Sequence, residues 1–197
     1  MLRFVVALAA EARPLVDRYR LERVSGGGAF PIFRRGGTAL VVSGVGKVAA
    51  AAATSYLHLS VAGAGAESGW INVGIGGHRR RPVGEAVIAH RIRDLASGRF
   101  WDLARLASAP CAGVEVLTVD RPEVAFREPG VYEMEASGFY PTARRFAASG
   151  LVHCLKVISD GPEIDPDALT RRRVAGLIEG QLEAVDRLAE ACRTAIR

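Results

Sequence analysis

Short apolar, strand-like runs alternate with helical segments along this chain, and that alternation constrains its fold more than any other feature. Residues 2–8 form a near-continuous apolar run with enough β-branched side chains for a buried central strand, and residues 11–19 then have helical character. A second strand-like run covers residues 151–159, and residues 166–196 carry an apolar stripe at helical spacing. The alternation predicts a three-layer α/β domain with a mixed central sheet.

The segments between these runs follow the same alternation. The other predicted strands are residues 30–34, 38–42, 70–73, 83–92 and 114–119. The other predicted helices are residues 48–59 and 136–148. Gly36 and Gly37 separate the first two of these strands into a hairpin. Residues 74–77 are rich in glycine and predict a tight turn where backbone approaches a ligand closely. Pro141 is expected to start or kink the second helix.

Length and composition indicate one ordinary globular domain that spans residues 1–197. Apolar residues make up 49% of the chain and charged residues 24%, which excludes a disordered or fibrous protein. The formal net charge is +5, but the arginines are scattered or lie in short runs without interleaved aromatic residues. We therefore expect no nucleic-acid partner, and the positive charge is suited to attracting anionic small molecules.

The cysteines, the histidines and the first residues exclude several other classes. The three cysteines are far apart and in no Cys-x-x-Cys spacing, so neither a disulfide framework nor a zinc ribbon is expected. The four histidines show no metal-ligand spacing, and we expect no metal and no cofactor. Residues 1–8 are too short an apolar run for a membrane span and lack a signal-peptide n-region. These features predict a cytoplasmic protein without a membrane partner.

Two carboxylates, Glu133 and Glu135, flank Met134 in an otherwise apolar stretch. A third carboxylate, Asp160, follows Ser159 at the end of a predicted strand, and α/β sheets bind their ligands at the carboxyl ends of strands. We expect Glu135 and Asp160 to face one pocket. The alternative is that Glu133 and Glu135 belong to a solvated first helical turn, where they complement the helix dipole.

A glycine loop that leads into the alanine-rich helix invites two sharper interpretations. A Walker A phosphate loop is excluded, because its lysine, Lys47, is followed by Val48 rather than Ser or Thr. Residues 44–49 fit the looser Gly-x-Gly-x-x-Ala fingerprint of dinucleotide sites. The acid expected about twenty residues later is only Glu67, which lies in a Gly/Ala loop rather than at a strand end, so dinucleotide binding is the lesser hypothesis.

The order of several short motifs resembles that of the nucleoside phosphorylase and methylthioadenosine/S-adenosylhomocysteine nucleosidase superfamily. The segments that carry the resemblance, over residues 1 to about 195, are residues 7–11, 43–48, 72–77, 133–136 and 158–160. The resemblance implies an α/β/α arrangement of layers, cleavage of the N-glycosidic bond of a purine nucleoside, and a homo-oligomer, most simply a dimer. It also implies a small-molecule nucleoside as the partner, with phosphate as a second partner if the reaction is phosphorolytic.

Cleaving a ribosyl–purine bond passes through a cation-like sugar and an anionic base, so an enzyme needs negative charge near the sugar and a proton donor near the base. The resemblance assigns the proton to Asp160, provided that burial keeps this side chain protonated, and it assigns activation of the attacking water to Glu11. Glu135 would accept hydrogen bonds from the ribose hydroxyls, with Met134 packed on the sugar. The remaining substrate-binding residues that the resemblance implies are Glu133, Ser43, Gly44, Gly74, Ser159, Phe100 and Trp101, and residues 120–123 occupy the place where relatives contact the base.

The choice of nucleophile rests on where this chain departs from its relatives. Residues 74–77 look one residue shorter than the nucleosidase motif and carry Ile75, and residues 69–71 lack the arginine with which phosphorylases commonly bind phosphate. These departures favour hydrolysis over phosphorolysis, unless Arg79, Arg80 or Arg81 supplies the charge. A second alternative is a nucleoside-binding or interaction module that performs no turnover.

Overall fold

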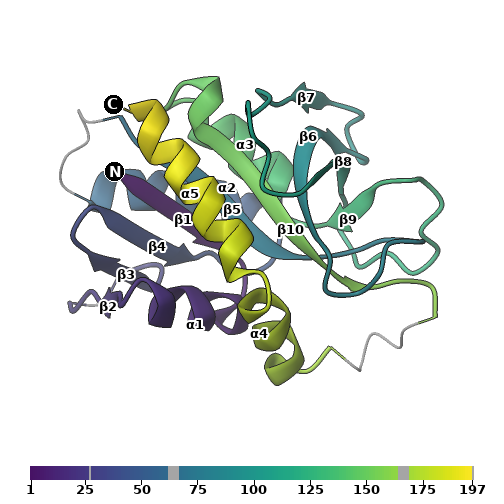
Figure 1. The fold of residues 1–197 in the computed structure, drawn as a ribbon, viewed down its shortest axis with the longest axis horizontal. Helices are drawn as coiled ribbons and strands as arrows, with labels where there is room; N and C mark the ends of the chain where they lie inside the picture. The colour runs from purple at the N-terminus through teal and green to yellow at the C-terminus, as the bar shows by residue number, and fades with distance from the viewer. Residues whose placement is uncertain (27, 62–66, 164–168, 197) are drawn as a thin grey trace.

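The computed structural model describes residues 1–26, 28–61, 67–163 and 169–196. It has helices on both faces of a mixed sheet, so the three-layer α/β/α expectation is confirmed (Figure 1). The strands are β1 Leu2–Val6, β2 Glu22–Arg23, β3 Ile32–Arg35, β4 Thr38–Val42, β5 Gly69–Gly77, β6 Ala86–Asp94, β7 Phe100–Asp102, β8 Ala112–Thr118, β9 Val131–Glu133 and β10 Val152–Asp160. The helices are α1 Ala9–Arg18, α2 Lys47–Ser60, α3 Ala136–Ala143, the 3₁₀ turn η1 Ser149–Leu151, α4 Arg171–Glu179 and α5 Leu182–Ile196.

The sheet has a parallel centre and a part that closes on itself. β1 pairs in parallel with β4 on one side and with β5 on the other, and β5 also pairs in parallel with β10. β10 then pairs antiparallel with β6, β6 pairs with β8, and β8 pairs with β9. β9 returns to β5 at the pair Gly77–Tyr132. The parallel pairing brings the carboxyl ends of β1, β5 and β10 to one edge, and the ring closure brings β9 there as well.

The side chains of β1 show how one strand supports both helical layers. Leu2, Phe4 and Val6 pack into the apolar cluster that contains residues of α1, α4 and α5, whereas Val5 packs into the cluster formed with α2 and α3. All four side chains are almost fully buried, as the continuous apolar run predicted. In Figure 1, α5 crosses the near face of the sheet and α2 lies behind it.

The glycine-rich residues 74–77 do not form the predicted turn but continue β5, which pairs with β10 up to Asp160 with a register shift after Ile158. Their neighbours explain the composition, because a Cβ atom at Gly76 would lie 2.6 Å from Val131 Cγ1 and 3.0 Å from the Tyr132 carbonyl oxygen. At Gly77 it would lie 2.4 Å from the ring of Phe126. Glycine is therefore needed for close packing against the segments around β9, not for a turn.

Two predicted helices differ in extent from the observed ones. α3 contains Pro141 and ends at Ala143, five residues before the predicted end at residue 148. The predicted helix over residues 166–196 is two helices, α4 and α5, that bury Ile178 and Val185 in the same apolar cluster. Its predicted start lies within 164–168, outside the described residues. None of the described helices is long and apolar enough to cross a membrane.

Candidate active site

A cavity of about 270 Å³ opens at the edge where the carboxyl ends of β1, β5 and β10 meet. Glu11, Glu135 and Asp160 line it together, although they lie far apart in the sequence. The other lining residues come from the ends of these strands, from β9, from the loops after β4 and β8 and from the segment before α4: Ala7, Leu8, Val45, Ile75, Gly76, Gly77, Val119, Pro122, Glu123, Phe126, Tyr132, Glu133, Met134, Ser159 and Leu169.

Glu11 is held in the first turn of α1 by backbone donors. Its Oε2 atom accepts hydrogen bonds from the amides of Ala7 at 2.9 Å and Leu8 at 2.8 Å, and its Oε1 atom accepts one from Ile75 at 3.0 Å. Burial raises the pKa of Glu11, and these hydrogen bonds and the charge of Lys156 oppose that shift. The carboxyl is thus fixed in place and is a better proton acceptor than an exposed glutamate.

Glu133 is a structural carboxylate rather than a solvated one. Its two oxygens accept hydrogen bonds from Thr118 Oγ1 at 2.6 Å and from the amides of Glu135 and Ala136 at 3.0 Å and 2.8 Å, at the start of α3. Lys156 Nζ lies 2.8 Å from Glu133 Oε2. Glu133 therefore fastens β9, β8, β10 and the start of α3 to one another.

Glu135 lies directly before α3 and faces the cavity with fewer partners. Its Oε1 atom accepts a hydrogen bond from the Gly46 amide at 2.9 Å, and its Oε2 atom lies 4.0 Å from Lys156 Nζ. Burial, together with the charges of Glu133 and Glu11, raises the pKa of Glu135 to about 7 against the opposing effect of Lys156. The alternative that Glu133 and Glu135 form a solvated helical turn is wrong, because both residues are buried.

Asp160 ends β10, and its side chain is only partly buried, whereas the expected proton-donor role relied on burial. The Ser159 hydroxyl donates a hydrogen bond to Asp160 Oδ1. Met134 lines the cavity between the two glutamates of β9 and α3, as a residue that packs on a ligand would. Asp160 and Met134 are thus more accessible than Glu11, Glu133 and Glu135.

Three predicted site residues lie near the cavity without lining it. The Ser43 hydroxyl is buried and lies 2.7 Å from the carbonyl oxygen of Gly44. Gly44 has a φ of 81° and donates its amide hydrogen to the Ala7 carbonyl at 3.0 Å, so it shapes the loop beside the end of β1. Gly74 gives room to Glu11, since a Cβ atom there would lie 3.0 Å from Glu11 Oε1.

Phe100 and Trp101 are not part of this cavity. They form β7 with Asp102 and pair with β6, where Arg91 lies over the Phe100 ring and Arg99 lies over the Trp101 ring. Phe100 remains 57% exposed. Within one chain, both rings therefore lie outside the cavity, and their expected contact with the substrate stays a prediction for an assembly of two chains.

Sequence reasoning missed two residues that the fold brings to the site. Lys156 is fully buried in β10, and its charge lies between Glu133 and Glu135. The carboxylates raise the pKa of Lys156 above its usual value although burial opposes this, so it stays charged. A lysine inside the apolar run 151–159 was the available signal, because an isolated buried charge requires a partner. Phe126, which lines the cavity edge-on to Tyr132, offered no such signal.

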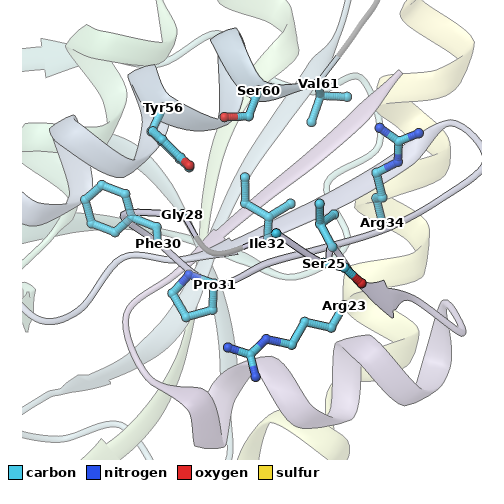
Figure 2. Close-up of a pocket in the computed structure, with 12 residues that line it drawn as sticks. Arg23, Ser25, Gly28, Phe30, Pro31, Ile32, Arg34, Tyr56, Ser60 and Val61 are labelled. Carbon is cyan, nitrogen blue, oxygen red and sulfur yellow. The ribbon is translucent and has the colours of Figure 1, made fainter.

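Two further hollows lack this combination of groups. One lies between α2 and the β2–β3 region, and Figure 2 shows that its arginines, Arg23 and Arg34, point away from each other. The other lies beside Asp160 and is lined by His78 to Arg81, with Arg81 paired to Glu85 at 2.5 Å. Among the described residues, no group of His, Cys, Asp and Glu side chains is arranged to hold a metal ion.

Solved structures similar to this fold include nucleosidases and a futalosine hydrolase. The 5′-methylthioadenosine nucleosidase of Arabidopsis thaliana superposes with a TM-score of 0.79 at 15% identity, over 100% of this chain and 95% of that one. A 5′-methylthioadenosine/S-adenosylhomocysteine nucleosidase from Colwellia psychrerythraea 34H, in complex with adenine, gives 0.77 at 17% identity, over 97% and 95%. Futalosine hydrolase of Helicobacter pylori strain 26695 gives 0.74 at 14% identity, over 96% and 97%.

These comparisons confirm the expected fold. No family model matches the chain. No curated protein matches it in sequence.

Proposed function

We propose that this protein hydrolyses the N-glycosidic bond of a purine nucleoside. The observation that carries the proposal is that Glu11, Glu135 and Asp160 line one cavity, each presented by a different segment of the sheet edge. The similar structures are nucleosidases and futalosine hydrolase, and one of them is a complex with adenine. The whole chain, residues 1–197, acts as a single nucleoside-cleaving domain.

Each carboxylate has a separate role in the proposed reaction. Glu135 accepts hydrogen bonds from the ribose hydroxyls, and the negative charge around it stabilises the cation-like sugar. As the bond from the sugar C1′ to the base nitrogen breaks, Asp160 donates a proton to the base, which leaves neutral. Stacking of the base in the cavity removes Asp160 from water, which supplies the burial that this side chain lacks.

Water is the nucleophile in this proposal. Glu11 accepts a proton from the water molecule as the water oxygen bonds to C1′ of the sugar. The products are then free base and ribose. Its carboxyl is already fixed by three backbone amides, which leaves its orientation independent of the substrate. Phosphate would have to approach the same buried carboxylates, which repel an anion.

Phosphorolysis is the second candidate, and Arg79 to Arg81 are the observation that favours it. These arginines line the hollow beside Asp160, and Arg79 and Arg80 are exposed. Arg81 is already paired with Glu85, so two arginines remain for an anion. A third candidate, nucleoside binding without turnover, requires a site without an activated nucleophile.

The active protein is proposed to be a cytoplasmic homodimer. Large apolar side chains stand on its surface, among them Val48 at 79%, Leu59 at 81% and Phe100 at 57% exposure. Burying such side chains against a second copy would be favourable. A dimer would also allow Phe100 of one chain to approach the cavity of the other.

A nucleoside panel tests the proposal directly. Adenosine, inosine, guanosine and 5′-methylthioadenosine are incubated with the protein, with and without phosphate, and free base and sugar are measured. Release of free base and ribose without phosphate supports hydrolysis. Release that requires phosphate and yields ribose 1-phosphate supports phosphorolysis, and binding without base release supports the non-catalytic alternative.

A further inference from the structure

Lys47 is the first residue of α2, where a cation is unfavourable because the helix dipole is positive at its N-terminus. Two aspartates compensate for it: Lys47 Nζ lies 2.8 Å from Asp94 Oδ2 and 2.9 Å from Asp120 Oδ1. These aspartates belong to different parts of the fold, since Asp94 ends β6 and Asp120 lies in the loop after β8. Lys47 thus joins three segments.

Asp94 is the buried end of this arrangement. Its side chain is 5% exposed and also accepts hydrogen bonds from Ser137 Oγ at 2.7 Å and from the Ser97 amide at 2.8 Å. Although burial opposes it, the hydrogen bonds from Lys47 and Ser137 hold the pKa of Asp94 well below its usual range. Asp94 therefore stays charged and ties α2 to the start of α3.

From Ser137 the contacts run on to the carboxylates of the site. The Ser137 amide donates to Thr118 Oγ1 at 3.0 Å, and the Thr118 hydroxyl donates to Glu133 Oε1 at 2.6 Å. Glu133 pairs with Lys156, whose ammonium group lies 4.0 Å from Glu135.

Glu135 closes the circle, because it accepts the amide hydrogen of Gly46, the residue directly before Lys47. The polar contacts therefore form a ring that begins and ends at Gly46 and Lys47. A displacement of Lys47 would move the preceding residue, Gly46, and with it the amide that donates a hydrogen bond to Glu135.

The pair of Lys47 with Asp120 lies outside this ring and joins two segments that line the cavity. Val45, next to Gly46, lines one wall, and Val119, Pro122 and Glu123, on either side of Asp120, line the other. Lys47 is 26% exposed and Asp120 is 57% exposed, so this ion pair is in contact with solvent. Among the ion pairs of the described residues, it is the one that links these two walls.

We propose that Lys47 is a positioning residue that fixes the distance between the two walls of the cavity and aims the Gly46 amide at Glu135. The buried Asp94 holds Lys47 in place, and Lys47 in turn holds the loop after β8 through its ion pair with Asp120. The effect on turnover rests on the proposed nucleosidase function, whereas the effect on the Gly46 amide does not.

The test compares Lys47→Met, Lys47→Arg and Asp120→Asn with a matched control, Arg13→Met, which removes the exposed Arg13–Asp17 pair on α1. Hydrogen exchange of the Gly46 amide is measured in each protein without any ligand. We expect Lys47→Met to accelerate this exchange roughly tenfold, because hydrogen-bonding groups of one network are energetically coupled. Lys47→Arg is expected to retain most of the protection, and Arg13→Met all of it.

Kinetics with the nucleoside that the wild type cleaves fastest supply the second readout. We expect Asp120→Asn, an exposed change that leaves the fold intact, to raise KM with little change in kcat. We expect Lys47→Met to lower kcat/KM roughly a hundredfold, because small displacements of positioned groups are costly.

The two readouts separate the positioning role from the reaction itself. Unchanged Gly46 exchange in Lys47→Met would overturn the positioning role, as would equal KM values in Asp120→Asn and wild type. If the wild type cleaves no nucleoside, the proposed function fails, and Gly46 exchange still decides the role of Lys47.

Discussion

Lys156 Nζ lies 2.8 Å from Glu133 Oε2, and both side chains are 1% exposed. The pair is buried beneath a cavity that Glu11 and Glu135 also line. Lys156 is thus the cation that Glu133, Glu135 and Glu11 share, and its charge favours their ionised forms beside the cavity. Ionised carboxylates at that place are suited to a cation-like sugar, which is the species that N-glycosidic cleavage would generate.

Breaking the buried pair is expected to destabilise the protein strongly. Lys156→Met leaves Glu133 buried without its cation, which should cost about 3–5 kcal/mol of unfolding free energy. The loss is measured by urea denaturation at pH 7. The double variant Lys156→Met/Glu133→Gln should recover part of it, because no uncompensated charge then remains at that position. A double variant as unstable as the sum of the two single variants would contradict this account.

The pKa of Glu135 predicts how stability depends on pH. Because this pKa is raised from 4.5 to about 7, the folded state binds more protons than the unfolded state between these values. The protonated form of Glu135 stabilises the folded state. This stabilisation is fully present below pH 4.5 and is lost as the pH rises through 7. The unfolding free energy of Glu135→Gln relative to that of the wild type should therefore rise by about 3 kcal/mol between pH 4.5 and pH 8. Urea denaturation of both proteins at several pH values provides the measurement, and a difference that stays constant with pH would refute it.

Asp160→Asn should separate binding from turnover. An amide cannot donate a proton to the departing base, so kcat should fall by about 10²–10⁴-fold while nucleoside binding persists. Single-turnover base release and calorimetric titration measure the two effects. Glu163→Gln, a change at an exposed carboxylate three residues further along, serves as the control and should leave kcat unaltered. An unchanged kcat in Asp160→Asn would remove Asp160 from the mechanism.

The close packing of β5 predicts a large effect of a single methyl group. Gly76→Ala places a Cβ atom 2.6 Å from Val131 Cγ1, and the overlap should cost about 1–3 kcal/mol of unfolding free energy. The matched control is Gly176→Ala in α4, where a Cβ atom meets nothing within 4 Å and the helix should gain about 1 kcal/mol. Thermal or urea unfolding of both variants decides the matter, and equal stabilities would argue against close packing at β5.

The exposed apolar side chains predict self-association. Light scattering at micromolar concentration should give twice the chain mass of 20.9 kDa. A mass that stays at 20.9 kDa over that range would contradict the dimer and would leave Phe100 without a cavity to approach.

Local sequence patterns were sufficient for the alternation of the longer strands and helices and for the grouping of the acidic residues, but not for the short strands β2, β7 and β9. Continuous apolar runs predicted β1 and β10, because a strand buried on both faces has no room for polar side chains. Glu11 and Asp160 follow such runs, and the carboxyl ends of parallel strands meet at one edge. Both residues could therefore be assigned to one edge before the structure was known.

Close packing could not be predicted in the same way, because it depends on residues that are distant in the sequence. The glycines of β5 give the same local signal for a turn and for a crowded strand, and only the return of β9 onto Gly77 distinguishes the two. Phe100 and Trp101 lie on β7, and nothing local in the sequence shows that this short strand pairs with β6 outside the cavity.

The sequence by itself determined the layers of the fold and the edge at which the carboxylates gather, since both follow from periodicity and from the direction of the strands. The tertiary structure alone decided which charges meet there. Lys156 reaches Glu133, and Lys47 reaches Asp94 and Asp120, only because β10 and α2 pack beside segments far away in the chain. The electrostatics of the site depend on these distances, and no pattern within a single segment specifies them.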